Sequence, residues 1–192
     1  MNKNLSNEPS GNANKKLSNS LANNSRKKLG PGDKAPDFEL PGDAGTKISL
    51  ASFAGKKLVL YFYPKDDTSG CTKEAIDFNG LQGDFKKAGA AILGVSPDTV
   101  ATHARFKAKH KLGFALAADE SKNVLEAYGV WAEKSMYGRK YMGVERTTFL
   151  IGQDGRIATV WNKVKVPDTP QRCWRGQESL DPRSGENLPR VR

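Results

Sequence analysis

Residues 58–71 read LVLYFYPKDDTSGC, an unbroken run of apolar and aromatic residues that leads into a turn and then a cysteine. Such a run predicts a strand that is buried on both faces. The apolar residues that follow recur at spacings of three and four, which indicates one face of a helix: Cys71, Ala75, Phe78, Leu81 and Phe85. A second apolar run, AAILGV at residues 90–95, predicts the next strand. Strand, helix and strand in close succession form a βαβ unit with parallel strands.

Two further helices are predicted from their boundary residues. Ser96 and Pro97 form a capping residue followed by a proline, and they predict a helix that runs to about Lys111. Ser121 caps the next helix, and Gly129 ends it. Both helices follow an apolar segment, as expected of an alternating α/β chain.

Short strands complete the pattern. Residues 114–116 predict one strand, and residues 147–151 and 156–161 predict a hairpin around an Asp-Gly turn. Residues 38–40 and 47–50 predict an earlier hairpin. The sequence therefore predicts the α/β class, with a mixed central sheet flanked by helices.

The composition divides the 192 residues into three parts. Residues 1–29 are rich in Asn, Ser and Lys and carry six basic residues against one acid, so we expect a disordered basic tail. Residues 30–166 form the predicted domain. Residues 167–192 contain four prolines, which break long helices, and we expect a poorly ordered C-terminal tail there.

Several classes of protein are excluded by composition. No apolar run is long enough to span a membrane, and two cysteines are too few for a disulfide scaffold or a cysteine-built zinc site. The net charge of +10 comes largely from the N-terminal tail, and paired lysines are scattered over the rest, so we expect a solvated surface and no nucleic-acid site. The tail lacks the apolar stretch of a secretory signal, which favours a cytoplasmic protein over a targeted one.

The turn after the buried strand carries the candidate site. Cys71 stands at the start of a helix, where free N–H groups and the helix dipole favour the thiolate, the nucleophilic form of cysteine. Thr68 offers a hydroxyl to the sulfur or to a substrate, and Pro64 offers a rigid apolar wall. Arg146, at the edge of a predicted strand, is the best candidate for a cation. A free cysteine is more commonly a small buried hydrophobic residue, so position alone leaves both interpretations open.

The whole string resembles the active-site motif of the peroxiredoxins, which is proline, three residues, threonine, two residues and cysteine. Pro64, Thr68 and Cys71 fit this motif. Residues 61–66 (YFYPKD), 71–75 (CTKEA), 128–131 (YGVW), 146–151 (RTTFLI) and 32–38 (GDKAPDF) are similar to the peroxiredoxin Q group, also called bacterioferritin comigratory protein. The resemblance extends from about residue 30 to 166.

This resemblance implies a thioredoxin-like fold and a thiol-dependent peroxidase. The Cys71 thiolate would attack a peroxide and become a sulfenic acid, while Thr68 and Arg146 hold the peroxide oxygens. Pro64 would shield the sulfenic acid, and Glu74 would orient Arg146. The implied partners are hydrogen peroxide or organic hydroperoxides and an external thiol reductant such as thioredoxin or a glutaredoxin/glutathione system. We expect a monomer without a cofactor or a metal.

Two departures from the peroxiredoxin Q pattern concern the second half of the cycle. Ile76 stands where many relatives carry a resolving cysteine, and the only other thiol is Cys173 in the C-terminal tail. The Pro- and Arg-rich tail does not look like the final amphipathic helix of relatives. We therefore predict a one-cysteine cycle, with a Cys71–Cys173 disulfide as the alternative, because a flexible tail can hold a thiol at high effective concentration.

Other chemistry-bearing residues are given no role. His103 and His110 are two helical turns apart, too far to share a metal, and are expected on the surface. Asp66-Asp67 is interpreted as turn chemistry. Three aromatic residues are expected to pack rather than to bind a ligand: Trp131, Tyr141 and Trp161.

Two other functions stay open on sequence alone. One is a non-enzymatic thioredoxin-fold protein that merely retains the motif. The other is a basic tail that docks on nucleic acid or an anionic membrane, which predicts salt-sensitive binding.

Overall fold

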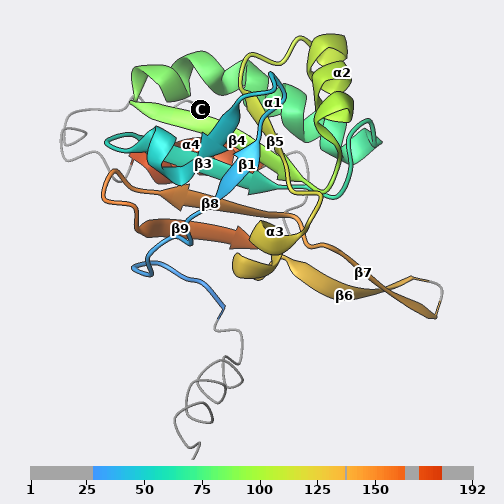
Figure 1. Ribbon diagram of the computed structural model, residues 1–192. Coiled ribbons are helices and arrows are strands. Elements are labelled where there is room, and N and C mark those ends of the chain that lie inside the picture. Colours follow the sequence, from blue (N-terminus) through green and yellow to red (C-terminus); the bar gives the residue numbers. More distant parts are fainter. Residues whose placement is uncertain (1–27, 137, 163–168, 179–192) are drawn as a thin grey trace, which may run out of the picture.

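A mixed five-stranded sheet forms the centre of the protein (Figure 1). The structure, a computed structural model, describes residues 28–136, 138–162 and 169–178. The strand order is β5-β4-β3-β8-β9, in which β3, β4 and β5 are parallel, β8 runs antiparallel to β3, and β9 runs antiparallel to β8. The strands are β3 (Lys57–Phe62), β4 (Ala90–Ser96), β5 (Ala115–Ala118), β8 (Thr147–Ile151) and β9 (Ile157–Asn162). The predicted mixed sheet and the βαβ unit are confirmed.

Helices cover both faces of this sheet. The remaining elements are α1 (Ser69–Lys87), α2 (Val100–His110), α3 (Asn123–Ala127), α4 (Thr169–Glu178), the 3₁₀ helix η1 (Leu50–Phe53) and two hairpins, β1 (Glu39–Pro41) with β2 (Lys47–Ser49) and β6 (Trp131–Met136) with β7 (Arg139–Val144). None of the helices in the described ranges is both long and apolar enough to cross a membrane.

Alternation along β3 divides the apolar core in two. Leu58, Leu60 and Phe62 join a cluster with residues of α3 and the N-terminal hairpin. Val59 and Tyr61 join a second cluster with residues of α1, α2 and α4. A run of six apolar residues is thus buried because both faces of the strand are covered, as the sequence predicts.

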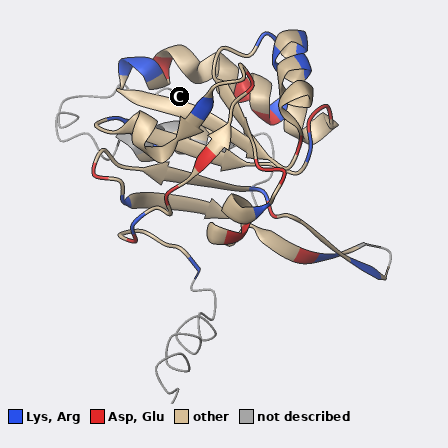
Figure 2. Cartoon of the chain, in the orientation of Figure 1, with Lys and Arg blue, Asp and Glu red and all other residues tan. Residues whose placement is uncertain are grey.

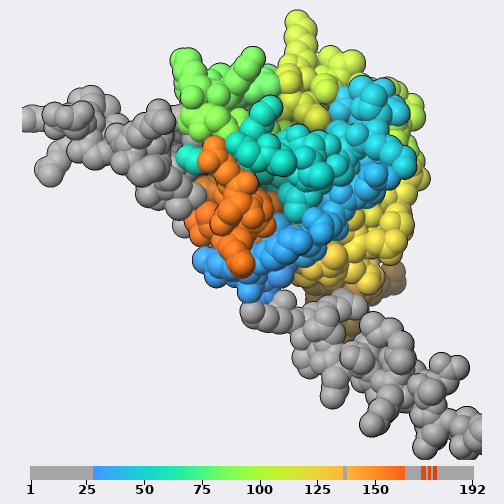
Figure 3. Space-filling view, turned by 60° about the vertical axis from the view of Figure 1, so that its left-hand side comes forward, coloured from blue at the N-terminus to red at the C-terminus, as the bar shows by residue number. Residues whose placement is uncertain are grey.

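The segment before β1 packs along the β8–β9 hairpin. Gly32 donates from its backbone to the carbonyl of Ile157 at 2.8 Å, and Ala35 donates to that of Gly155 at 3.0 Å. In Figure 3 this blue stretch lies against the orange hairpin strands. These contacts begin at Gly32, and the domain boundary near residue 30 stays a prediction.

The predicted start of the second helix is wrong. Ser96 is the last residue of β4, and α2 begins at Val100. The cap is Thr99, whose hydroxyl accepts a hydrogen bond from the backbone N–H of Thr102. Ser96 remains extended because its carbonyl accepts from Asp119 in the strand ladder, and ladder pairing outweighs its local tendency to cap a helix.

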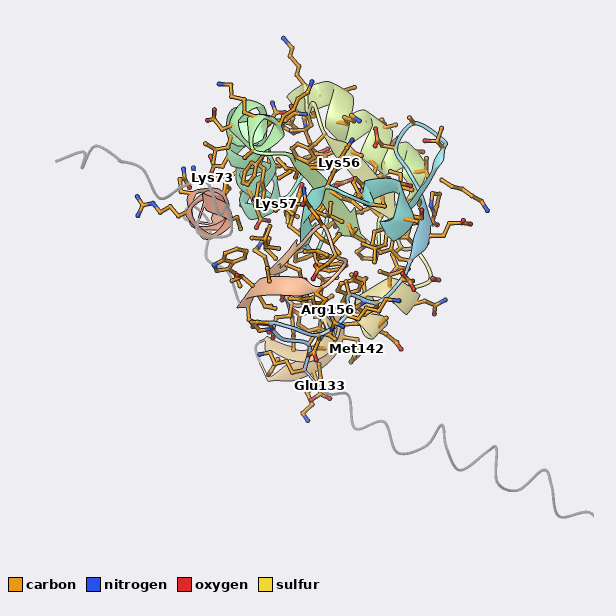
Figure 4. The ribbon with its side chains drawn as sticks, turned by 90° about the vertical axis from the view of Figure 1, so that its left-hand side faces the viewer. Lys56, Lys57, Lys73, Glu133, Met142 and Arg156 are labelled. Carbon is orange, nitrogen blue, oxygen red and sulfur yellow. The ribbon has the colours of Figure 1, made fainter. Side chains whose placement is uncertain are left out.

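The expectation of a C-terminal tail without a helix is wrong for part of residues 167–192. Thr169–Glu178 form α4, which packs against α1 and against β8 (Figure 4). Pro170 stands at its second position, where a proline disturbs no intrahelical hydrogen bond. Residues 1–27, 163–168 and 179–192 lie outside the described residues, and so does most of the predicted N-terminal tail.

The β6–β7 hairpin is an element that the sequence reasoning missed. It extends away from the sheet and carries charged residues toward its far end (Figure 2). Tyr141 on β7 is 45% exposed, so the expectation that it packs in the core is wrong. Trp131 and Trp161 are half-buried against the two apolar clusters, which confirms them as packing residues.

Two glycine substitutions are expected to change stability in opposite directions. A Cβ added at Gly94 would lie 2.7 Å from the buried ring of Tyr61 and 2.8 Å from Leu116. Since both side chains are buried, Gly94→Ala should lower the free energy of unfolding by about 1–3 kcal/mol.

Gly80 in α1 has nothing within 4 Å of an added Cβ, so Gly80→Ala should raise the free energy of unfolding by up to about 1 kcal/mol. Urea denaturation measures both changes, and a Gly94→Ala protein as stable as wild type would contradict the close packing at β4.

Candidate active site

Cys71 lies in the first turn of α1, at the carboxyl end of β3. The turn from residue 64 to 68 connects the two elements, and α1 begins at Ser69. The Arg146 guanidinium reaches the sulfur, with 3.1 Å between Nη2 and Sγ. It also passes Gly70, where an added Cβ would come within 3.6 Å of Nη2. The predicted association of Cys71 with Arg146 is confirmed.

Glu74 holds the other side of the same guanidinium. Its Oε2 accepts a hydrogen bond from Nη1 of Arg146. The Glu74 side chain is fully buried, and its Oε1 has no hydrogen-bond partner among the described residues. Arg146 therefore bridges a buried carboxylate and the sulfur of Cys71. Glu74 thus lies where it can orient Arg146, the role that the resemblance implied for it.

Burial sets the protonation of Glu74. Removal from water raises its pKa from 4.5 to about 7, although the charge and hydrogen bond of Arg146 act in the opposite direction. The pKa of Arg146 is raised: burial lowers it, but Glu74 and Cys71 together more than compensate. The guanidinium therefore keeps its positive charge beside the sulfur.

Pro64 and Thr68 lie in the turn that precedes α1, and they are more exposed than Cys71. Cys71 is only 2% exposed, whereas Pro64 is half-buried and Thr68 is exposed. The Thr68 hydroxyl donates to the carbonyl of Lys65 at 3.0 Å, so the prediction that it donates to the sulfur is wrong. The reason is local: Thr68 ends the turn, and its hydroxyl folds back over it. Its lone pairs remain available to accept a hydrogen bond from a substrate.

A buried polar network behind the turn was missed. His103 is fully buried, so its expected surface position is wrong, and its Nδ1 lies 2.8 Å from Oδ2 of Asp66. Tyr63 donates to the other oxygen of Asp66 at 2.7 Å. The spacing of His103 three residues before the buried Phe106 was the available signal, since it places both on one face of α2. Asp67 is the expected turn residue, and its Oδ1 binds Lys109 and His110 at the surface.

Cys173 lies on α4 and is fully buried. It belongs to the same apolar cluster as Cys71, and the two cysteines are not joined by a disulfide in the structure. The expectation that Cys173 sits on a flexible tail is therefore wrong.

Replacing Glu74 by glutamine should change how stability depends on pH. A folded-state pKa of about 7 means that the folded protein holds this proton more tightly than the unfolded chain, so wild-type stability falls as the pH rises from about 5 to 7. Between pH 5.5 and pH 8 this group should remove roughly 2 kcal/mol from the free energy of unfolding, given the pKa of about 7.

The Glu74→Gln protein should not show this decrease in the free energy of unfolding when urea titrations at the two pH values are compared. Glu120→Gln, on an exposed turn, is the matched control and should behave as wild type; a Glu74→Gln protein with the wild-type dependence would contradict the raised pKa.

Similarity to known proteins agrees with this geometry. Residues 31–160 match the AhpC/TSA family. The chain belongs to that family. Within the AhpC/TSA family, Peroxiredoxin Bcp of Bacillus subtilis is 50% identical over 137 residues, which are 71% of this chain and 87% of the relative.

Two solved structures have the same fold as this chain. The Xanthomonas campestris bacterioferritin comigratory protein, described for its alkyl peroxide reduction activity, is 42% identical with a TM-score of 0.71, and the match covers 74% of this chain and 90% of that one. A mutant of Xylella fastidiosa PrxQ is 36% identical with a TM-score of 0.76, and the match covers 80% and 98%. The peroxiredoxin Q resemblance and the thioredoxin-like fold are confirmed.

Proposed function

We propose that this protein is a thiol-dependent peroxidase that reduces hydrogen peroxide and organic hydroperoxides through a sulfenic acid on Cys71. The observation that carries the proposal is the Arg146 guanidinium, held by Glu74 and directed at the sulfur from 3.1 Å. A cysteine that served only as packing would have no need of a cation. Membership of the AhpC/TSA family, with peroxiredoxin relatives, supports the same activity over a non-enzymatic role.

The first step transfers one oxygen to the sulfur. Arg146 favours the thiolate, because a charge-assisted hydrogen bond is strongest to the anion. The thiolate attacks one peroxide oxygen, a sulfur–oxygen bond forms and the oxygen–oxygen bond breaks. The departing oxygen takes up a proton and leaves as water or an alcohol, while Cys71 becomes a sulfenic acid. Negative charge moves from sulfur to the departing oxygen, which Arg146 and Thr68 would stabilise.

Pro64 limits what happens to the product. It lacks an N–H, and by the peroxiredoxin resemblance it would form an apolar wall for Cys71, which is 2% exposed. A second peroxide would have to enter the same confined space to oxidise the sulfenic acid further. We therefore assign Pro64 to protection and Arg146 and Thr68 to the peroxide.

An external thiol completes the cycle. The thiol attacks the Cys71 sulfenic acid, water leaves, and a mixed disulfide forms; a second thiol then releases reduced Cys71 and carries away the disulfide. Thioredoxin and a glutaredoxin/glutathione system are the proposed reductants. We place this monomeric enzyme in the cytoplasm, where the thiol reductants that its cycle requires are kept reduced.

A disulfide between Cys71 and Cys173 is the competing route, and the location of both residues in one apolar cluster favours it. Mass spectrometry after one equivalent of peroxide distinguishes the two routes. With dimedone present, we expect a single adduct on Cys71 and an unmodified Cys173, because Cys173 is buried on α4. A Cys71–Cys173 disulfide as the main product would replace the one-cysteine cycle, and an unmodified Cys71 would refute the peroxidase proposal.

A further inference from the structure

The loop that carries Pro64 and Thr68 is connected to α2 by a buried hydrogen bond between Asp66 and His103. Asp66 accepts hydrogen bonds from Tyr63 on one oxygen and from His103 on the other, at 2.7 and 2.8 Å. The side chains of Asp66 and His103 are 1% and 0% exposed. We call these three residues the Asp66 anchor. Because a carboxylate oxygen only accepts hydrogen bonds, Nδ1 of His103 is the donor in this contact.

The other polar contacts that the structure shows between the loop and the segment of residues 98–110 lie nearer to solvent. The Asp66 N–H donates to Asp98 in the turn before α2, and Asp67 binds Lys109 and His110 in a partly exposed position. Asp67 also has φ of 56°, a left-handed conformation that aspartate adopts more readily than most non-glycine residues. Figure 1 shows the loop between β3 and α1 passing beside α2.

The anchor acts on the residues that would meet the peroxide. Asp66 follows Lys65 directly, and the carbonyl of Lys65 accepts a hydrogen bond from the hydroxyl of Thr68. A shift of Asp66 would move this carbonyl, and the direction of the Thr68 lone pairs would change with it. Pro64 is only two residues away on the other side.

The second nitrogen of His103 shows that packing does not explain this residue. Nε2 is buried and has no hydrogen-bond partner within the described ranges. An aliphatic side chain would fill the same apolar face of α2 without leaving a polar atom unpaired. The one interaction that requires histidine at this position is the Nδ1–H bond to Asp66.

We propose that His103 is a positioning residue of the peroxidase, which acts through Asp66 to hold the loop of Pro64 and Thr68 in the geometry that receives a peroxide. The inference rests on the proposed function. It also assigns Asp66 to the same task, in place of a plain turn residue. His103 touches neither the sulfur nor the peroxide.

Two substitutions at one position separate positioning from packing. Asparagine carries an N–H on the atom that corresponds to Nδ1, so His103→Asn keeps the donor to Asp66 while losing the bulk of the ring. His103→Leu keeps an apolar side chain of useful size and loses the donor. Positioning therefore predicts that the asparagine variant is the more active, whereas packing predicts the reverse.

The measurement is the second-order rate constant for oxidation of Cys71 by hydrogen peroxide, by stopped-flow, beside the rate of its alkylation by iodoacetamide. We expect His103→Leu to slow oxidation by about tenfold or more, because small misplacements of positioning groups have large effects on rate. His103→Asn should remain within about threefold of wild type, and alkylation should stay within about twofold in both, since it requires no peroxide geometry. His110→Leu, at the exposed contact, is the matched control on α2.

Each outcome bears on the proposal. A His103→Leu protein that reacts as fast as wild type would overturn it, and so would an asparagine variant as slow as the leucine variant. If the leucine variant does not fold, Asp66→Asn takes its place, with the same loss expected and the same result overturning it. A wild-type protein that does not react with peroxide would refute the proposed function itself, which the positioning variants alone cannot do.

Discussion

Replacing Cys71 by serine is expected to reduce peroxide consumption to the uncatalysed background, a loss of at least about a thousandfold. A serine hydroxyl stays protonated at neutral pH, and Arg146 alone cannot make it a nucleophile. The assay follows the peroxide-dependent oxidation of a thiol reductant. The substitution is nearly isosteric in a site where Cys71 is 2% exposed, so the fold should survive.

Cys173→Ala is the matched control for that experiment. Cys173 is also a buried thiol in the same apolar cluster, and its loss removes the only other sulfur that could form a disulfide. In a one-cysteine cycle this variant should keep at least about half of the wild-type turnover. Equal activity of wild type and Cys71→Ser would show that the thiol is not the reacting group.

Replacing Arg146 by glutamine is expected to slow the oxidation of Cys71 by roughly 100- to 1,000-fold, the usual cost of removing a donor that stabilises charge as it develops. The guanidinium acts twice: it favours the thiolate, and it is close enough to bind the peroxide oxygens. The rate of alkylation of Cys71 by iodoacetamide should fall as well, although by less, because alkylation uses only the first effect. Stopped-flow oxidation and alkylation rates measure the two parts.

Glu74 complicates this substitution, since Arg146→Gln leaves a buried carboxyl without its cation. The double variant Glu74→Gln, Arg146→Gln removes that difficulty and should be more stable than the single variant while reacting as slowly. Arg156→Gln, at an exposed arginine that binds the carbonyl of Gly32, should react as wild type. A double variant with the wild-type oxidation rate would remove Arg146 from the reaction.

The sequence correctly predicted those helices and strands whose apolar spacing and turn residues favour the same structure as their tertiary packing. β3, α1 and the β8–β9 hairpin were predicted, because continuous apolar runs, three-and-four spacing and an Asp-Gly turn each allow one structure. The start of α2 was mispredicted, because Ser96 and Pro97 form a good local cap that pairing in the sheet overrides. The helix α4 was missed because four prolines suggested a broken segment, whereas packing against α1 stabilises ten helical residues.

The site divides in the same way. Cys71, Thr68 and Pro64 lie within eight residues, so their order along the chain was enough to predict that they lie together. Arg146 was predicted as a candidate cation, although 75 residues separate it from Cys71. Asp66 and His103 were placed in a turn and on the surface, because nothing in either local pattern indicates a partner 37 residues away.

The sequence by itself determined the alternation of strands and helices and the placement of a cysteine at the start of a helix, since both follow from spacing between near neighbours. Only the tertiary structure decided which distant groups face each other: Arg146 between Glu74 and the sulfur, and His103 against Asp66. The physical reason is that hydrogen bonds and ion pairs form where the sheet brings chain segments together, and the pairing of β3 with β4 and β8 sets those positions.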